Sequence, residues 1–150
     1  MTRDEVLAEV KKYFSIDELV CNHALSKWGE RAWQFLDTTF LENLIVVRRD
    51  ILKAPMWSNN HKKGVYQRGL GCNRCQMVTS KSSVYLSAHC LGKAADFTVE
   101  GMTAEQARLK IKANASLLPH PIRLEKGVTW LHMDTLPQCG VSDKVYLFTA

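Results

Sequence analysis

The sequence predicts an α+β fold in which N-terminal helices pack on a small, mostly antiparallel sheet. Residues 1–53 carry apolar side chains at three- and four-residue spacing, which is typical of helices. The second half carries short alternating segments with one helical segment between them, which is the order of an α+β protein. At 150 residues we expect a single domain, 1–150.

Helix-start signals locate the N-terminal elements. Thr2-x-x-Glu5 is a capping box that opens a helix to about Tyr13, and Ser15-x-x-Glu18 predicts a second, short helix. A longer helical pattern covers 27–53, with a break near Asp37. Its apolar positions predict a core face formed by Trp33, Leu36, Phe40, Leu44 and Val47.

The remaining elements are a polar loop over 59–83 and a set of strands around one helix. Thr103-x-x-Gln106 caps that helix, which runs to about Asn114. Alternating or apolar segments predict strands at Pro55–Ser58, Ala94–Val99, Ile122–Glu125, Val128–Asp134 and Val145–Phe148. We expect the third and fourth of these to form a hairpin around Lys126-Gly127.

Two histidines and one aspartate predict a catalytic zinc site. His89 and Asp96 lie in Ser87-Ala-His-Cys-Leu-Gly-Lys-Ala-Ala-Asp-Phe97, and His132 lies in the later strand. Three protein ligands with an open fourth position are typical of catalytic zinc, whereas a structural zinc has four. A water at the open position has a pKa lowered toward neutrality. Gly92 and the small residues nearby allow a close backbone approach.

The motif Ser87-x-His89-x-x-Gly92-x-Ala94-x-Asp96, followed by an aromatic-rich strand carrying His132, resembles the zinc D-alanyl-D-alanine metallopeptidases. That family includes cell-wall carboxypeptidases, murein endopeptidases and phage endolysins, and the hedgehog signalling domain shares its zinc scaffold. The resemblance covers about residues 14–135 and implies that His89, Asp96 and His132 are the zinc ligands.

The resemblance also implies substrate-binding residues. Family members carry an arginine upstream of the first zinc ligand, followed by an asparagine, and Arg68 and Asn73 occupy those places here. Arg68 would bind a substrate carboxylate or polarise the scissile carbonyl, because a guanidinium forks onto planar oxygens. The alternative is a solvated loop arginine. Ser87, at the start of the motif, is the second predicted substrate-binding residue.

The general base is not fixed by the sequence. Many family members have an acid three residues before the last histidine, where this chain has Thr129. Asp134 is favoured because it faces the same side of a strand as His132, about 7 Å away. The alternative is that Asp134 orients His132. In the expected hairpin Glu125 lies about 13 Å along the strand from His132, so a cross-strand salt bridge is its favoured role.

The five cysteines argue against a complete disulfide framework, because their number is odd. Cys72-x-x-Cys75 is half of a zinc ribbon and could recruit Cys21 or Cys139 to a structural zinc. The alternative is a set of reduced, partly buried thiols. His23 is predicted to be a surface residue.

The net charge and the distribution of basic residues limit the kinds of partner that we expect. The net charge of +5 favours an anionic polymer such as bacterial wall or nucleic acid, but the basic residues are scattered and no nucleic-acid motif is present. No signal peptide or membrane-spanning run is visible, so we expect a monomer made in the cytoplasm as a soluble protein. It would reach the cell wall after release by a holin or lysis, as a phage protein does.

Two functions from different classes remain at this point. The first is a zinc-dependent peptidase that cleaves peptidoglycan stem peptides, with Arg68 at the oxyanion and Asp134 or Glu125 moving the proton. The second is a zinc-bearing peptidoglycan-binding module with weak or no catalysis, which the threonine at position 129 favours. A nucleic-acid-binding domain would rest only on the charge and on Cys72 and Cys75.

Overall fold

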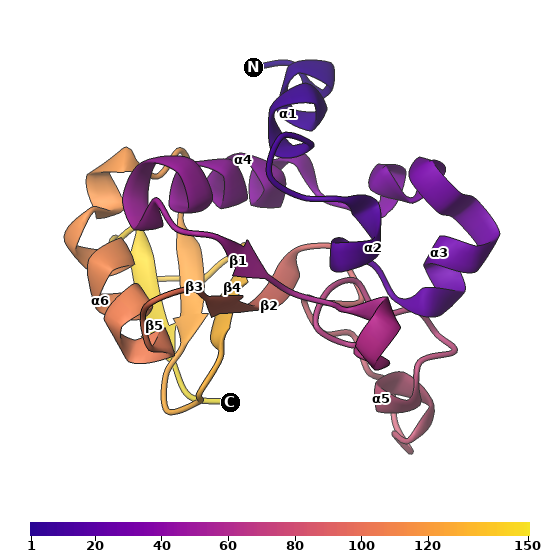
Figure 1. The fold of residues 1–150 in the computed structure, drawn as a ribbon. Helices are drawn as coiled ribbons and strands as arrows, with labels where there is room; N and C mark the ends of the chain where they lie inside the picture. The colour runs from indigo at the N-terminus through magenta and orange to yellow at the C-terminus, as the bar shows by residue number, and fades with distance from the viewer.

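The computed structural model describes residues 1–150 and has the predicted α+β architecture (Figure 1). The helices come first and pack on a five-stranded sheet. The elements in chain order are α1 (Arg3–Val10), α2 (Ile16–Leu19), α3 (Asn22–Trp28), η1 (Gly29–Phe35), α4 (Thr38–Val46), η2 (Val47–Leu52), β1 (Met56–Trp57), η3 (His61–Lys63), α5 (Gln76–Thr79), β2 (Ala94–Val99), α6 (Ala104–Ala113), η4 (Ala115–Leu117), β3 (Ile122–Glu125), β4 (Leu131–Asp134) and β5 (Val145–Phe148).

The helix starts predicted at Thr2, Ser15 and Thr103 are confirmed, whereas the helix expected from residue 27 begins at Asn22. Thr2 and Thr103 form complete capping boxes at α1 and α6. The long helical pattern is interrupted at Asp37, as predicted, because its carboxylate accepts a hydrogen bond from the Phe40 amide at 3.1 Å and caps α4. Before this cap the chain forms the 3-10 turn η1, and after α4 it forms the π turn η2.

The sheet has the order β1-β2-β4-β3-β5. Its first three pairings are antiparallel and the β3–β5 pairing is parallel, so the prediction of a mostly antiparallel sheet is confirmed. The predicted two-residue hairpin turn is wrong. Arg123 pairs with Asp134 and Leu124 with Met133, so the connection spans residues 126–130.

Alternation along the strands gives the sheet one apolar and one polar face. The apolar face of β2 and β4 carries Phe97, Leu131 and Met133, each with at most 1% of its surface exposed. These side chains belong to one core cluster of 32 residues that includes the predicted face of α4 and η1. Phe14, which follows α1, packs against Phe97 with 5.8 Å between ring centroids. The polar face carries Asp96, His132 and Asp134.

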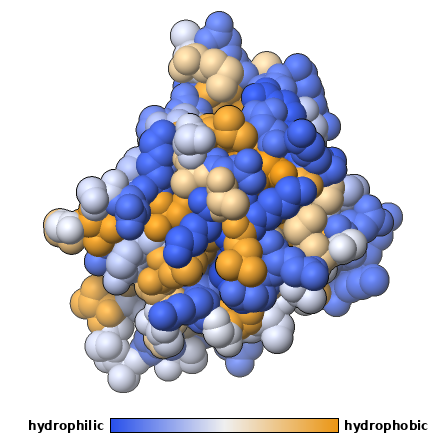
Figure 2. Space-filling model, turned by 90° about the vertical axis from the view of Figure 1, so that its left-hand side faces the viewer, coloured by the Kyte–Doolittle hydropathy of each residue, from blue (hydrophilic) through white to orange (hydrophobic).

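Helix α6 flanks the sheet at one end, and α2, α3 and α5 gather at the opposite end (Figure 1). Figure 2 shows the end with α6, where apolar side chains form separate patches between hydrophilic ones. Leu109 of α6 and Leu117 of η4 are among the exposed apolar residues of the chain. No helix is long and apolar enough to cross a membrane.

Gly92 fixes the segment that follows His89 against the helical layer. Its φ is +68°, and a Cβ built there would lie 1.9 Å from the carbonyl oxygen of Phe35. The Gly92 carbonyl accepts a hydrogen bond from the Asp37 amide at 2.9 Å. The close approach expected at this glycine is therefore present, and it ties the turn that carries His89 to the start of α4.

Replacing Gly92 by alanine should lower the free energy of unfolding by more than about 1 kcal/mol, because the new Cβ meets a backbone carbonyl and the positive φ strains an L residue. Urea denaturation of both proteins measures the difference. Gly71→Ala is the matched control, since no atom lies within 4 Å of a Cβ at that position. Equal destabilisation by both substitutions would contradict the role of Gly92.

Candidate functional site

The pairing of β2 with β4 brings two of the predicted zinc ligands together. Asp96 lies directly opposite His132 in the antiparallel register, so both side chains point to the polar face. His89 reaches the same point from the turn that precedes β2. One ligand atom from each of these residues lies within 4.8 Å of the others, and the group is compatible with a metal ion.

The imidazole of His89 is oriented by the backbone. Its Nδ1 lies 2.9 Å from the Gly69 carbonyl oxygen, to which it donates a hydrogen bond. This contact fixes the proton on Nδ1 and leaves the Nε2 lone pair directed toward Asp96, whose Oδ2 lies 3.6 Å away. Metal-binding histidines typically use one ring nitrogen for the metal and donate from the other.

His132 is oriented in the same manner by a carboxylate. Its Nε2 lies 2.7 Å from Asp134 Oδ2, and its Nδ1 lies 2.9 Å from Asp96 Oδ1. Nδ1 is therefore the atom of this ring that faces the ligand group, and Asp134 lies at the opposite edge. The donor set of two imidazole nitrogens and one carboxylate fits zinc.

The charges of these groups depend on one another. Burial lowers the pKa of His132, but its hydrogen bonds with Asp134 and Asp96 outweigh burial and raise the pKa to about 9. Burial raises the pKa of Asp96, but the hydrogen bond from His132 and the nearby imidazole of His89 outweigh burial and hold the pKa below its usual range. A metal ion would take the place of the proton on His132 Nδ1.

Asp134 has no free oxygen with which to act as a base. Its side chain is fully buried, and Arg123 binds it with two hydrogen bonds of 2.8 and 2.9 Å. Its Oδ1 also accepts from the Leu136 amide, and its Oδ2 binds His132. These contacts favour the alternative weighed for Asp134, in which it orients His132.

Glu125 lies closer to the ligands than the sequence suggested. One step beyond the Leu124–Met133 pair, the β3–β4 register places Glu125 level with His132 and on the same face of the sheet. Its side chain is half-buried and forms no ion pair, so the predicted cross-strand salt bridge is not found. Of the two acids, Glu125 is the one with a free carboxylate.

Arg108 of α6 holds the connection between β3 and β4. Its guanidinium is buried and donates to the carbonyl oxygens of Glu125, Val128 and Trp130 at 3.1–3.2 Å. This clamp fixes the backbone of the five-residue connection, which bears the exposed Thr129 and Trp130. Sequence reasoning missed Arg108, because the three carbonyls that it binds are backbone groups distant in the chain; its remaining partner is the Glu105 carboxylate, at 2.9 Å.

Arg68 lies beside the ligand group with part of its guanidinium unused. Its Nη1 donates to Thr98 Oγ1 at 3.2 Å and to the Ser58 carbonyl at 3.4 Å. Nε and Nη2 form no hydrogen bond and can receive a planar anion. The backbone carbonyl of Arg68 accepts from the Asp96 amide at 2.7 Å. Burial lowers the pKa of Arg68, while the charge of Asp96 raises it, and burial prevails.

The other residues singled out in the sequence have different surroundings. The Ser87 hydroxyl donates to Cys90 Sγ at 3.5 Å, so it is engaged within its own turn. His61, a nearby histidine in the polar loop over 59–83, lies 3.2 Å from the Val20 carbonyl oxygen and packs against Tyr66. Neither side chain joins the His89–Asp96–His132 group.

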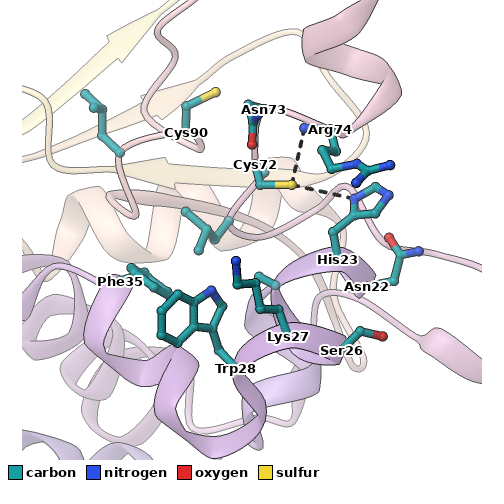
Figure 3. A pocket seen from close by; sticks show the side chains of 14 residues that line it. Asn22, His23, Ser26, Lys27, Trp28, Phe35, Cys72, Asn73, Arg74 and Cys90 are labelled. Carbon is teal, nitrogen blue, oxygen red and sulfur yellow. Dashed lines mark hydrogen bonds between the residues drawn. The ribbon is translucent and has the colours of Figure 1, made fainter.

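A second group of metal-binding side chains lies outside this site. Cys21, His23, Cys72 and Cys75 place their ligand atoms within 4.8 Å of one another. Cys139 is exposed and takes no part. The surface role predicted for His23 is wrong, because its ring faces Cys72 (Figure 3). The spacing Cys21-x-His23, read together with Cys72-x-x-Cys75, was the signal in the sequence.

A pocket with a volume of about 930 Å³ borders this second group. It is lined by residues of α3 and η1 on one side and by residues 70–74, Cys90 and Leu91 on the other (Figure 3). The pocket does not contain His89, Asp96 or His132. The candidate metal site formed by His89, Asp96 and His132 is therefore separate from this pocket.

Comparison of the chain with models of protein families, with curated proteins and with solved structures found no match.

Proposed function

We propose that this protein is a zinc-dependent peptidase that hydrolyses short peptides of peptidoglycan. The observation that carries the proposal is the convergence of His89, Asp96 and His132, with both imidazoles oriented by outer hydrogen-bond partners. A zinc ion bound there would supply Lewis acidity and a lowered pKa for a water at its open position. The resemblance of the surrounding motif to D-alanyl-D-alanine metallopeptidases supports a cell-wall substrate.

In this proposal Glu125 is the general base. It would accept a proton from the attacking water and return it to the leaving amine, since its carboxylate is free and lies on the ligand face. Asp134 stays ionised between Arg123 and His132 and holds the ring in position. Arg68 presents Nε and Nη2 to a carboxylate or carbonyl oxygen of the substrate, held in place by its bond to Thr98.

The alternative is a zinc-bearing module that binds peptidoglycan without cleaving it. The specific observation in its favour is Thr129, where many related enzymes carry an acid, together with the full engagement of Asp134 by its neighbours. Both functions agree with a net charge of +5, which would attract an anionic wall polymer.

Incubation with purified peptidoglycan should release soluble peptides, and a chelator should abolish the release until zinc is restored. His132→Ala should lose activity and bind one equivalent of zinc less than the wild type, because one of three ligands is gone. Chromatography of the products and metal analysis measure these outcomes. His120→Ala is the control, since His120 pairs with Glu42 away from the ligands. If the protein sediments with peptidoglycan but does not cleave it, the binding module is favoured. If the protein neither binds nor cleaves peptidoglycan, both functions are refuted.

Glu125→Gln should keep zinc but lower the rate by about 10²–10⁴-fold, the usual size of general-base assistance. Glu100→Gln, at an exposed position with no side-chain hydrogen bond, is the matched control and should leave the rate unchanged. Asp134→Asn should mainly reduce stability and zinc affinity, because it weakens the ion pair that the buried Asp134 forms with Arg123. Steady-state kinetics on zinc-loaded proteins separate these effects. Full activity of Glu125→Gln would exclude Glu125 as the base.

Arg68→Lys should keep zinc content and thermal stability while losing most activity, because an ammonium cannot fork onto a carboxylate. The loss should be smaller on substrates that lack a free carboxylate near the scissile bond, if Arg68 binds that group. Thermal denaturation, metal analysis and kinetics on both kinds of substrate provide the test. Unchanged turnover would make Arg68 an ordinary loop arginine.

A further inference from the structure

Three thiols and one imidazole converge at a place that the proposed peptidase chemistry does not use. Cys21 is the N-cap of α3 and His23 lies in the first turn of that helix. Cys72 and Cys75 come from the long segment between β1 and β2, about fifty residues away. Figure 3 shows the His23 ring directed at Cys72 at one edge of the large pocket.

The three distances among His23, Cys72 and Cys75 match the edges of a zinc tetrahedron, and Cys21 Sγ lies within 4.8 Å of each of these ligand atoms. Zn–S bonds of about 2.3 Å and Zn–N bonds of about 2.0–2.1 Å give S···S edges of about 3.8 Å and S···N edges of about 3.6 Å. The structure has 3.9 Å between Cys72 Sγ and Cys75 Sγ. His23 Nδ1 lies 3.6 Å from Cys72 Sγ and 3.7 Å from Cys75 Sγ.

Backbone amides point at two of the sulfurs. The Arg74 amide donates to Cys72 Sγ at 3.4 Å, and the Ala24 amide donates to Cys21 Sγ at 3.5 Å. Such bonds favour a thiolate over a thiol, because they stabilise the charged form. Thiolates are the form in which cysteine binds metals. A set of apolar, reduced thiols would need neither these amides nor the imidazole.

The segment that contains Cys72 and Cys75 has little apolar packing to hold it. Within 61–87 only Gly69, Leu70 and Cys75 are buried, so few apolar contacts stabilise this part of the chain. Cys21 and His23 belong to the helical layer, which joins the main core through Leu19, Val20 and Cys21. A metal ion bound by both regions would hold them together where apolar packing does not.

We propose that Cys21, His23, Cys72 and Cys75 bind a second zinc ion with a structural role. Four protein ligands leave no open position for water, which distinguishes this site from the His89–Asp96–His132 site. The ion would staple residues 68–75 to the start of α3. Its binding free energy would stabilise the folded arrangement of that segment.

The same segment serves the first site. The Cys21 amide donates to the Leu70 carbonyl at 2.9 Å, and the neighbouring Gly69 carbonyl orients His89. The Arg68 carbonyl accepts from the Asp96 amide. Loss of the structural ion should therefore reduce peptidase activity indirectly, through the positions of Arg68 and His89. Only this last consequence rests on the proposed function.

Metal analysis and cobalt substitution test the proposal independently of catalysis. Cys72→Ser, purified under reducing conditions, should bind one equivalent of zinc less than the wild type. The cobalt-loaded wild type should show thiolate-to-cobalt charge-transfer absorption in the near ultraviolet. That absorption should persist in His132→Ala and disappear in Cys72→Ser. Cys139→Ser is the matched control and should keep both metals.

A wild-type protein without the thiolate absorption, or with five thiols that react equally fast before and after chelation, would overturn the proposal. If Cys72→Ser fails to fold, a thiol-specific mercurial added to the wild type should release one equivalent of zinc while the other stays bound. Release of none would also overturn it. Failure of the peptidase proposal would appear differently, as absent hydrolysis in a protein that retains the thiolate absorption.

Discussion

The register between β2 and β4 is the constraint on which the candidate site depends. Asp96 lies opposite His132, and this pairing places a carboxylate and an imidazole at hydrogen-bond distance on the polar face. A slip of one residue would turn either side chain into the core. The register is fixed by the other face, where Phe97, Leu131 and Met133 must stay buried. Core packing and ligand placement are therefore two consequences of one alignment.

Hydrogen bonds from outside the candidate metal group orient its two imidazole rings. Gly69 holds His89 through a backbone carbonyl, and Asp134 holds His132 through a carboxylate that Arg123 keeps ionised. The ion pair of Asp134 and Arg123 is largely buried, where a lone charge would be costly. The pair thus makes it possible to keep a carboxylate behind His132. The Phe148 ring of β5 covers the guanidinium of Arg123, with 4.3 Å between its centroid and Cζ, and shields it from solvent.

The two candidate metal groups share a single stretch of chain. Residues 68–75 contain Arg68, the carbonyl that orients His89 and two of the four side chains of the cysteine group. This stretch is poorly packed but richly hydrogen-bonded to Leu19, Cys21 and His89. A segment with so few apolar contacts can hold Arg68 in place only if polar or metal bonds replace the missing packing.

The sequence by itself determined the local features: the capping boxes at Thr2 and Thr103, the break at Asp37 and the strand Ala94–Val99. These depend on side chains a few residues apart, whose periodicity or capping chemistry acts within one element. Only the tertiary structure decided which acid has a free carboxylate, because that follows from the five-residue β3–β4 connection clamped by Arg108. It also decided that His23 and Cys21 meet Cys72 and Cys75. Contacts across fifty residues depend on how the layers pack, and no local pattern encodes that packing.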